Sequence, residues 1–185
     1  MFRLLDFTFA LTGLLFGAPV FLIIYIAGCF DTGSPLFRQE RVGRNRESFI
    51  LIKFRTMNVE TVSVASHLAS TSSITRLGGF LRKTKLDELP QLWNVLKGEM
   101  SLVGPRPNLY NQIELIEHRD RLNVYDVRPG ITGLAQVSNI DMSTPEILAK
   151  LDAKMIKELS LANYFRYIFM TLTGSGQGDR VKQSS

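Results

Sequence analysis

The sequence predicts an α+β protein that is mainly helical with a few short strands, an N-terminal membrane helix and interfacial amphipathic helices. Residues 7–30 contain no charged side chain. The segments 108–120, 144–158 and 161–174 space their apolar residues as amphipathic helices do. The last of them mixes Tyr, Phe and Met, which suits a helix in the membrane interface, although a core helix fits almost as well. Runs with strand composition are short, such as FILIKFR at 49–55, and no β-α-β alternation marks a nucleotide-binding sheet.

The uncharged run at 7–30 is long enough to cross a bilayer, because as a helix it measures about 36 Å against about 30 Å for the hydrocarbon core. Pro19, preceded by Gly13, Gly17 and Ala18, would kink that helix and could return it to the leaflet it entered. Both flanks are basic, which a re-entrant helix satisfies better than a span. Kinked helices that span are common, however, so the run alone favours a spanning helix.

Composition narrows the classes of partner and chemistry. The net charge is +5, with cations gathered in Arg38–Lys53 and Arg76–Lys85, which indicates an anionic partner such as phosphate, lipid headgroups or nucleic acid. Cys29 is the single cysteine, which excludes an intramolecular disulfide, and its apolar neighbours predict a buried side chain. His67 and His118 lie far apart in the sequence, and neither is expected to be a metal ligand. The chain has no GxxxxGK[ST], GxGxxG, GxSxG or CxxC motif.

The pattern divides the chain into three parts. Residues 1–30 form the predicted membrane anchor, 31–174 the folded domain and 175–185 a flexible tail. Within the folded domain, the Ser/Thr-rich segment 58–75 predicts a mobile loop or lid. VRPGITGLAQV, at 127–137, predicts a turn followed by a short extended stretch.

Asp87 and Glu88 are adjacent carboxylates in a basic stretch. Helices are expected at 76–83 and from 86 or 88 to 96, so the pair would lie in a first turn, where acidic residues complement the helix dipole. Neighbouring residues on a helix do not face each other, which rules out a shared proton. One of them could still be a nucleophile toward phosphorus or a ligand of a divalent metal. Catalysis and a purely structural role both remain open on the residues alone.

Several basic side chains stand at predicted element ends or between turn-forming residues. Arg106 lies within GPRP and Arg128 within RPG, where proline and glycine fix the direction of the backbone. A solvated surface arginine is the plainer interpretation for any one of them, but two arginines held in this way favour phosphate contacts. The candidates for phosphate binding are Lys53, Arg55, Arg82, Arg106 and Arg128.

Three segments closely resemble the bacterial sugar transferases, the small monotopic phosphoglycosyl transferases of glycan assembly. They are KFRTM, ITRLGGFLRKTKLDELPQLWNVLKGEMSLVGPRP and VRPGITGLAQV, and the similarity runs from Arg3 to about Val137. The resemblance implies transfer of a sugar 1-phosphate from a UDP-sugar to polyprenyl (undecaprenyl) phosphate, with Mg²⁺ and release of UMP. It makes 31–174 the catalytic domain. It also implies that the protein acts at the cytoplasmic face of the bacterial inner membrane. There it would catalyse the first membrane step of O-antigen, capsule, exopolysaccharide or glycoprotein assembly.

The resemblance also assigns roles to residues. Asp87 becomes the nucleophile that forms a covalent phosphosugar intermediate, and also a Mg²⁺ ligand, while Glu88 becomes the general base for the lipid phosphate. Lys53, Arg82, Arg106 and Arg128 fall in motif segments that are expected to bind phosphates or support the site. The family's re-entrant helix with a central proline matches Pro19, which reverses the preference for a spanning helix.

This sequence departs from the family pattern at several points. Ala18 stands where many relatives have Ser before the proline, so a hydroxyl that could support the kink is missing. Ser138-Asn139-Ile140 replaces the Asn-Gly-Arg of many relatives, which suggests a different sugar. Asp152 is matched to an acidic residue of the next helix in relatives and is expected to bind substrate. We also expect a minimal catalytic unit without several N-terminal spans.

Two other functions compete with this interpretation. A membrane-anchored basic adaptor that binds anionic lipid or nucleic acid would explain the charge and the anchor, but not the DELPQL and VGPRP motifs. Hydrolysis of UDP-sugars without a lipid acceptor is the enzymatic alternative. We expect no nucleic-acid partner; the sequence leaves a homodimer open and does not identify the sugar.

Overall fold

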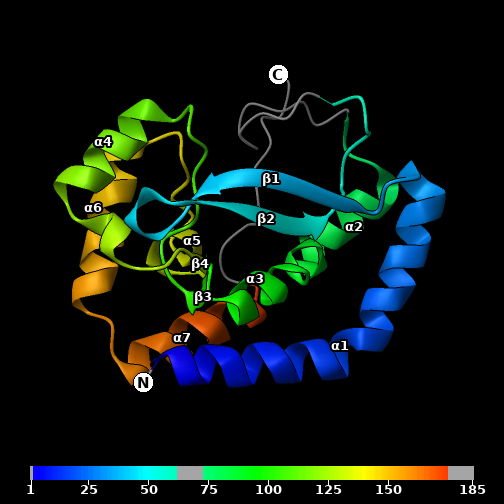
Figure 1. Ribbon diagram of the computed structural model, residues 1–185, viewed down its shortest axis with the longest axis horizontal. Coiled ribbons are helices and arrows are strands. Elements are labelled where there is room, and N and C mark those ends of the chain that lie inside the picture. Colours follow the sequence, from blue (N-terminus) through cyan, green and yellow to red (C-terminus); the bar gives the residue numbers. More distant parts are fainter. Residues whose placement is uncertain (1, 62–72, 175–185) are drawn as a thin grey trace.

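The computed structural model describes residues 2–61 and 73–174, and it is mostly helical with a few short strands, as predicted (Figure 1). The hairpin β1–β2 lies over α2 and α3, the first half of α1 runs beneath them beside α7, and α4 and α6 close one end. The elements are α1 (Phe2–Thr32), β1 (Leu36–Val42), η1 (Arg44–Arg46), β2 (Ser48–Phe54), α2 (Arg76–Thr84), η4 (Leu86–Glu88), α3 (Gln91–Lys97), β3 (Ser101–Val103), α4 (Ile113–Arg121), η5 (Val124–Asp126), β4 (Gly130–Thr132), α5 (Leu134–Val137), α6 (Pro145–Lys157) and α7 (Leu161–Leu172).

Helix α1 is long and apolar enough to cross a membrane by length and composition. It contains Pro19 and changes direction along its course (Figure 1), as expected where proline removes a backbone hydrogen bond. Only 11% of its most apolar window is buried, so α1 is not a core helix of the folded domain. The prediction that Cys29 is buried is wrong: its side chain is exposed because this part of α1 has little protein around it.

The first turns of α1 are tied to the folded domain by buried polar contacts. Arg3 donates to the backbone oxygens of Val95 and Leu96, at 2.5 and 2.9 Å, and so binds the C-terminal end of α3. Asp6 is 2% exposed and accepts hydrogen bonds from the start of β3 and, at 2.9 Å, from the Tyr164 hydroxyl. Burial, and then the Asp6 carboxylate, raise the pKa of Tyr164. The helix start is therefore part of the domain's packing.

The second half of α1 and the segment just after it are tied to the same domain, and Ile24 packs in one buried cluster with Phe54 and Leu81. Arg55, just after β2, donates its Nε to the Ser34 oxygen at 2.9 Å and its backbone N–H to the Pro35 oxygen at 2.8 Å. A Cβ on Gly28 would lie 2.8 Å from the Pro35 side chain, so a larger residue would push the helix end away. Both ends of the apolar helix thus lie against one folded body.

Two small sheets organise the domain. β1 and β2 pair antiparallel, with Leu36 opposite Phe54 and Val42 opposite Ser48. β3 and β4 pair parallel, and the chain between them forms α4 and η5. This β-α-β connection was not predicted, because strands of three residues are too short for alternation to be visible in the sequence.

Most predicted helices are present, but the single helix expected from 86 or 88 to 96 is wrong. The chain instead forms the 3₁₀ turn η4 and then α3, with Pro90 between them at the N-cap of α3. Lys85, which precedes η4, has a left-handed backbone with φ 59°. Most of the predicted lid and the predicted tail lie outside the described residues.

A pair of neighbouring glycines in α2 gives the first testable prediction. A Cβ on Gly78 would lie 2.0 Å from the Thr56 backbone oxygen, whereas a Cβ on Gly79 meets nothing within 4 Å. We expect Gly78→Ala to lower the free energy of unfolding by about 1–3 kcal/mol or more, because backbone must move. Gly79→Ala, the matched control, should raise it by roughly 0.5–1 kcal/mol. Thermal unfolding in detergent measures both, and equal stabilities would contradict the packing of α2 on Thr56.

Candidate active site

The adjacent carboxylates lie in η4, between the end of α2 and the start of α3. Asp87 is 5% exposed and Glu88 is partly buried. Lys85 donates its Nζ to the Thr171 oxygen at 3.2 Å, which ties this turn to α7. Burial lowers the pKa of Lys85, Glu88 opposes that shift, and the nearby Arg106 adds to it. The acidic pair therefore sits on a strained, partly buried turn in a cationic setting.

Arg106 reaches this turn from the GPRP segment. Its Nη2 lies 2.8 Å from Oε1 of Glu88, and the two side chains are 24% and 11% exposed. A charge-assisted contact of this kind fixes the direction of both groups. The structure thus brings together two of the sequence motifs singled out for chemistry, DELPQL and GPRP.

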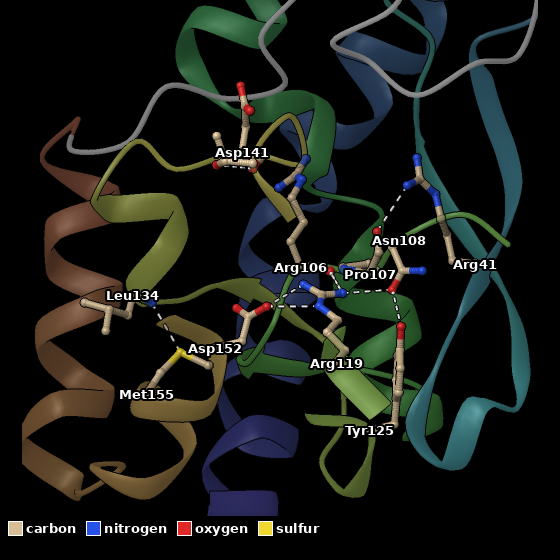
Figure 2. Close-up of polar contacts among 11 residues, drawn as sticks. Arg41, Arg106, Pro107, Asn108, Arg119, Tyr125, Leu134, Asp141, Asp152 and Met155 are labelled. Carbon is tan, nitrogen blue, oxygen red and sulfur yellow. Dashed lines mark hydrogen bonds and ion pairs between the residues drawn. The ribbon is translucent and has the colours of Figure 1, made fainter. Parts of the chain in front are cut away.

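The turn that carries Arg106 is held through its carbonyl oxygens. Prolines at 105 and 107 have no backbone N–H to donate, so the turn has few backbone donors and depends largely on its acceptors. Four consecutive carbonyls each accept a hydrogen bond from another part of the fold, and Figure 2 draws two of them. The Pro105 oxygen accepts from Gly130 N at 2.8 Å, and the Arg106 oxygen accepts from Arg119 Nη1 at 2.9 Å. The Pro107 oxygen accepts from Arg41 Nη1 at 3.1 Å, and the Asn108 oxygen accepts from Val42 N at 2.9 Å.

Behind the turn lies a buried polar cluster (Figure 2). Arg119 is 1% exposed and donates to Asp152 Oδ2 from Nε and Nη2, at 3.0 and 2.6 Å. Its Nη1 also donates to Asn108 Oδ1 at 2.8 Å, and the Tyr125 hydroxyl donates to the same oxygen at 3.0 Å. Burial raises the pKa of Tyr125, opposed by Arg119. Burial also raises the pKa of the Asp152 carboxyl, again opposed by the two hydrogen bonds from Arg119.

This cluster changes the interpretation of Asp152. The family resemblance predicts that Asp152 binds substrate, but its carboxylate is 1% exposed and turned toward Arg119. Arg119 itself was missed, because it sits among charged residues in the sequence. One signal could have found it: Arg119 lies three and four residues after Ile116 and Leu115, so it falls on the apolar face of α4.

The other basic candidates take several positions. Lys53 and Arg55 lie over the Phe37 ring, 5.6 and 5.5 Å from its centroid, and Lys53 is 8% exposed. Arg82 donates its Nε to the Thr56 hydroxyl at 2.8 Å. Their predicted phosphate contacts remain predictions.

Arg128 points elsewhere. Its Nε donates to the Gly98 oxygen at 2.7 Å, so together with Arg3 it binds the C-terminal end of α3. It lines a cavity of about 300 Å³ whose walls include Arg3 and Arg44 but not the acidic pair or Arg106. The structure therefore groups Arg106 with the carboxylates and gives Arg128 a contact that also stabilises the fold.

The segment that replaces the relatives' Asn-Gly-Arg follows α5. Asn139 has a left-handed backbone with φ 58°, and Asp141 next to this segment accepts a hydrogen bond from the Ser143 N–H at 2.9 Å. In Figure 2 the Arg106 side chain extends toward the loop that carries Asp141.

A magnesium ion at this site would need ligands from the substrate as well as from the protein. Within residues 2–61 and 73–174, no group of three or more His, Cys, Asp or Glu side chains could hold a metal. Mg²⁺ usually keeps several waters and binds one or two carboxylates together with substrate phosphates. The neighbouring Asp87 and Glu88 fit that kind of site.

Comparison with known proteins identifies the class. A model of the family described as bacterial sugar transferase matches residues 1–177, and the chain belongs to this family. It is 39% identical over 194 residues to the UDP-galactose-lipid carrier transferase of Erwinia amylovora and 39% identical over 191 residues to a sugar transferase of Haemophilus influenzae. Each match covers 92% of this chain and 40% of the relative.

The names of two further relatives include undecaprenyl phosphate. The chain is 33% identical to the undecaprenyl-phosphate galactose phosphotransferase of Salmonella typhimurium, over 91% of this chain and 39% of that protein. It is 37% identical to the UDP-glucose:undecaprenyl-phosphate glucose-1-phosphate transferase of Xanthomonas campestris, over 83% of this chain and 34% of that protein. The chain thus spans about 40% or less of the length of these relatives.

Proposed function

We propose that this chain transfers a sugar 1-phosphate from a UDP-sugar to membrane polyprenyl phosphate, such as undecaprenyl phosphate, and releases UMP. The observation that carries the proposal is the Arg106–Glu88 contact beside the buried Asp87, which joins two carboxylates and a guanidinium suited to phosphate binding in one place. Family membership and the acceptors named for the Salmonella and Xanthomonas relatives support it.

In the first half-reaction, a carboxylate oxygen of Asp87 attacks the sugar-bearing phosphorus of the UDP-sugar. A new P–O bond forms, the bridging P–O bond to the other phosphate breaks, and UMP leaves with that electron pair. The enzyme then carries an aspartyl phosphosugar. An anionic nucleophile is repelled by a diphosphate, so the reaction needs the cationic setting that Arg106 and Lys85 supply.

In the second half-reaction, an oxygen of polyprenyl phosphate attacks the same phosphorus. The bond from Asp87 breaks and the carboxylate is restored. Glu88 takes the proton that the lipid phosphate loses, and Arg106 holds the Glu88 carboxylate in direction through the 2.8 Å contact. The product is a polyprenyl diphosphate sugar.

Mg²⁺ is the proposed cofactor, with Asp87 as a ligand and Glu88 beside it. When bound, the ion neutralises phosphate charge and helps to orient the diphosphate. The carboxylates of η4 supply the hard oxygen ligands that Mg²⁺ prefers.

We further propose that α1 is re-entrant and places the domain on the cytoplasmic face of the bacterial inner membrane. Both ends of α1 lie against the same folded body, through Arg3 and Asp6 at one end and Ile24 at the other, and this supports a re-entrant helix over a spanning one. Impermeant thiol labelling in cells tests this, with Cys29→Ser as background and cysteines at Asp31 and in a short N-terminal tag. We expect both cysteines to be equally protected from a reagent added outside the cell. Labelling of one cysteine but not the other would refute the re-entrant helix.

Metal and acceptor removal test the reaction class. With a panel of UDP-sugars we expect UMP release that needs Mg²⁺, is lost with EDTA and returns with added Mg²⁺. Multiple turnovers should require polyprenyl phosphate. Turnover without lipid would indicate hydrolysis instead, and no UMP release with any UDP-sugar would favour the adaptor.

A further inference from the structure

The position of Arg106 depends on a side chain outside the acidic pair. A single nitrogen, Nη1 of Arg119, donates both to the backbone oxygen of Arg106 at 2.9 Å and to Oδ1 of Asn108 at 2.8 Å (Figure 2). These acceptors lie on either side of Pro107, so one planar group bridges the turn. Because the Arg106 side chain leaves from this backbone toward Glu88, a shift of the turn would move the guanidinium that contacts Glu88.

Arg119 is in turn oriented by Asp152. Two nitrogens of Arg119 donate to one oxygen, Oδ2, and this contact joins α4 to α6. The other oxygen, Oδ1, is buried and has no hydrogen-bond partner within residues 2–61 and 73–174, which is costly for a carboxylate. A buried ion pair with an unsatisfied oxygen is poor evidence for stability, since well-packed apolar residues often replace such pairs without loss. The Arg119–Asp152 pair is therefore better explained by a role other than stability.

We propose that Arg119, oriented by Asp152, is a positioning residue: it fixes the 105–108 turn so that Arg106 meets Glu88. The inference rests on the proposed function for its effect on catalysis, but its structural part does not. Misplacement of a catalytic group by about 1 Å can reduce a rate by about 10²-fold. Loss of the bridge should thus reduce activity even when the domain stays folded.

The apolar double variant Arg119→Met/Asp152→Leu separates positioning from stability. It removes both charges together, so neither is left buried alone. We expect a Tm close to that of the wild type and a kcat/KM for UMP release at least about 10-fold lower. A stable double variant with wild-type activity would overturn the proposal. Glu146→Gln is the matched control, because it breaks an exposed ion pair with Lys150 on the same helix, α6, and should leave both properties unchanged.

Combination with Arg106→Ala tests whether Arg119 acts through Arg106. If it does, adding the double substitution to Arg106→Ala should cost less than about 2-fold more in kcat/KM, because groups that act as one unit are not additive. Losses that multiply would mean that Arg119 affects the site by another route. If the double variant does not fold, Arg119→Lys serves instead. Lysine keeps the charge, but its single nitrogen cannot take the place of Nη1 on the turn and of Nε and Nη2 on Asp152 at once. A similar loss is therefore expected, and full activity would overturn the proposal.

Hydrogen exchange gives a readout that does not depend on activity. Amides of the peptide around residues 103–112 should exchange faster in the double variant, or in Arg119→Lys, than in the wild type and Glu146→Gln. Unchanged exchange there would refute the structural part of the inference. If the wild type released no UMP, the proposed function would fail, while faster exchange would still support the role of Arg119 in holding the turn.

Discussion

Asp87→Asn is expected to abolish UMP release, both in multiple turnovers and in a single turnover without lipid. An amide is a poor nucleophile toward phosphorus and a poor ligand for Mg²⁺, so both proposed roles of Asp87 are lost together. Asp87 is buried, and the substitution keeps its size, so the fold should survive. The measurement is quenched-flow UMP release with UDP-sugar and Mg²⁺, alongside thermal unfolding of the same preparation.

Glu88→Gln provides the comparison for this result. If Glu88 is the base for the lipid phosphate, the first half-reaction should survive better than in Asp87→Asn, and the defect should fall chiefly on the lipid step. Normal single-turnover release by Asp87→Asn would place the nucleophile elsewhere.

Arg106→Ala is expected to lower kcat/KM by one to two orders of magnitude while the Tm stays close to that of the wild type. The substitution removes the proposed charge-assisted hydrogen bond from Arg106 to a substrate phosphate, which is worth roughly 1.5–3 kcal/mol. Each 1.36 kcal/mol corresponds to a factor of ten in rate. The Arg106 side chain is directed to Glu88, and the turn itself is held through backbone oxygens that the substitution leaves in place.

Arg128→Ala should behave differently. The sequence motif predicts a loss of activity with an intact fold. The hydrogen bond from Arg128 to the Gly98 oxygen adds a structural role at the C-terminal end of α3, so we also expect a lower Tm. Unchanged kinetics in both variants would mean that neither arginine contacts a phosphate. A stable but inactive Arg128→Ala would show that its role at α3 is minor.

The sequence predicted features that depend on local pattern. The apolar run of α1 with its internal Pro19, and the amphipathic helices α4, α6 and α7, follow from composition and spacing, and the structure confirms these helices. The hairpin of β1 was not predicted, because its basic side chains hide a strand in which Arg41 is buried. The parallel pair β3–β4 was missed because each strand has three residues.

The candidate site shows the same division. Asp87 and Glu88 stand out in the sequence as adjacent carboxylates in a basic stretch, and Arg106 as an arginine within GPRP; Arg106 and Glu88 meet in the structure. Arg119 and Asp152 could not be paired from sequence, because their contact joins α4 to α6 across 33 residues and depends on tertiary packing. Asp152 was therefore expected to bind substrate, whereas its carboxylate lies behind the 105–108 turn, against Arg119.

The most direct test of the central claim is the intact mass of the wild-type protein after incubation with a UDP-sugar and Mg²⁺ in the absence of polyprenyl phosphate. We expect a gain of one sugar phosphate per chain, release of up to about one UMP per enzyme, and loss of the added mass when polyprenyl phosphate is supplied. An unmodified protein that releases UMP only when lipid is present would contradict this expectation, because polyprenyl phosphate would then attack the UDP-sugar directly and Asp87 would be no nucleophile.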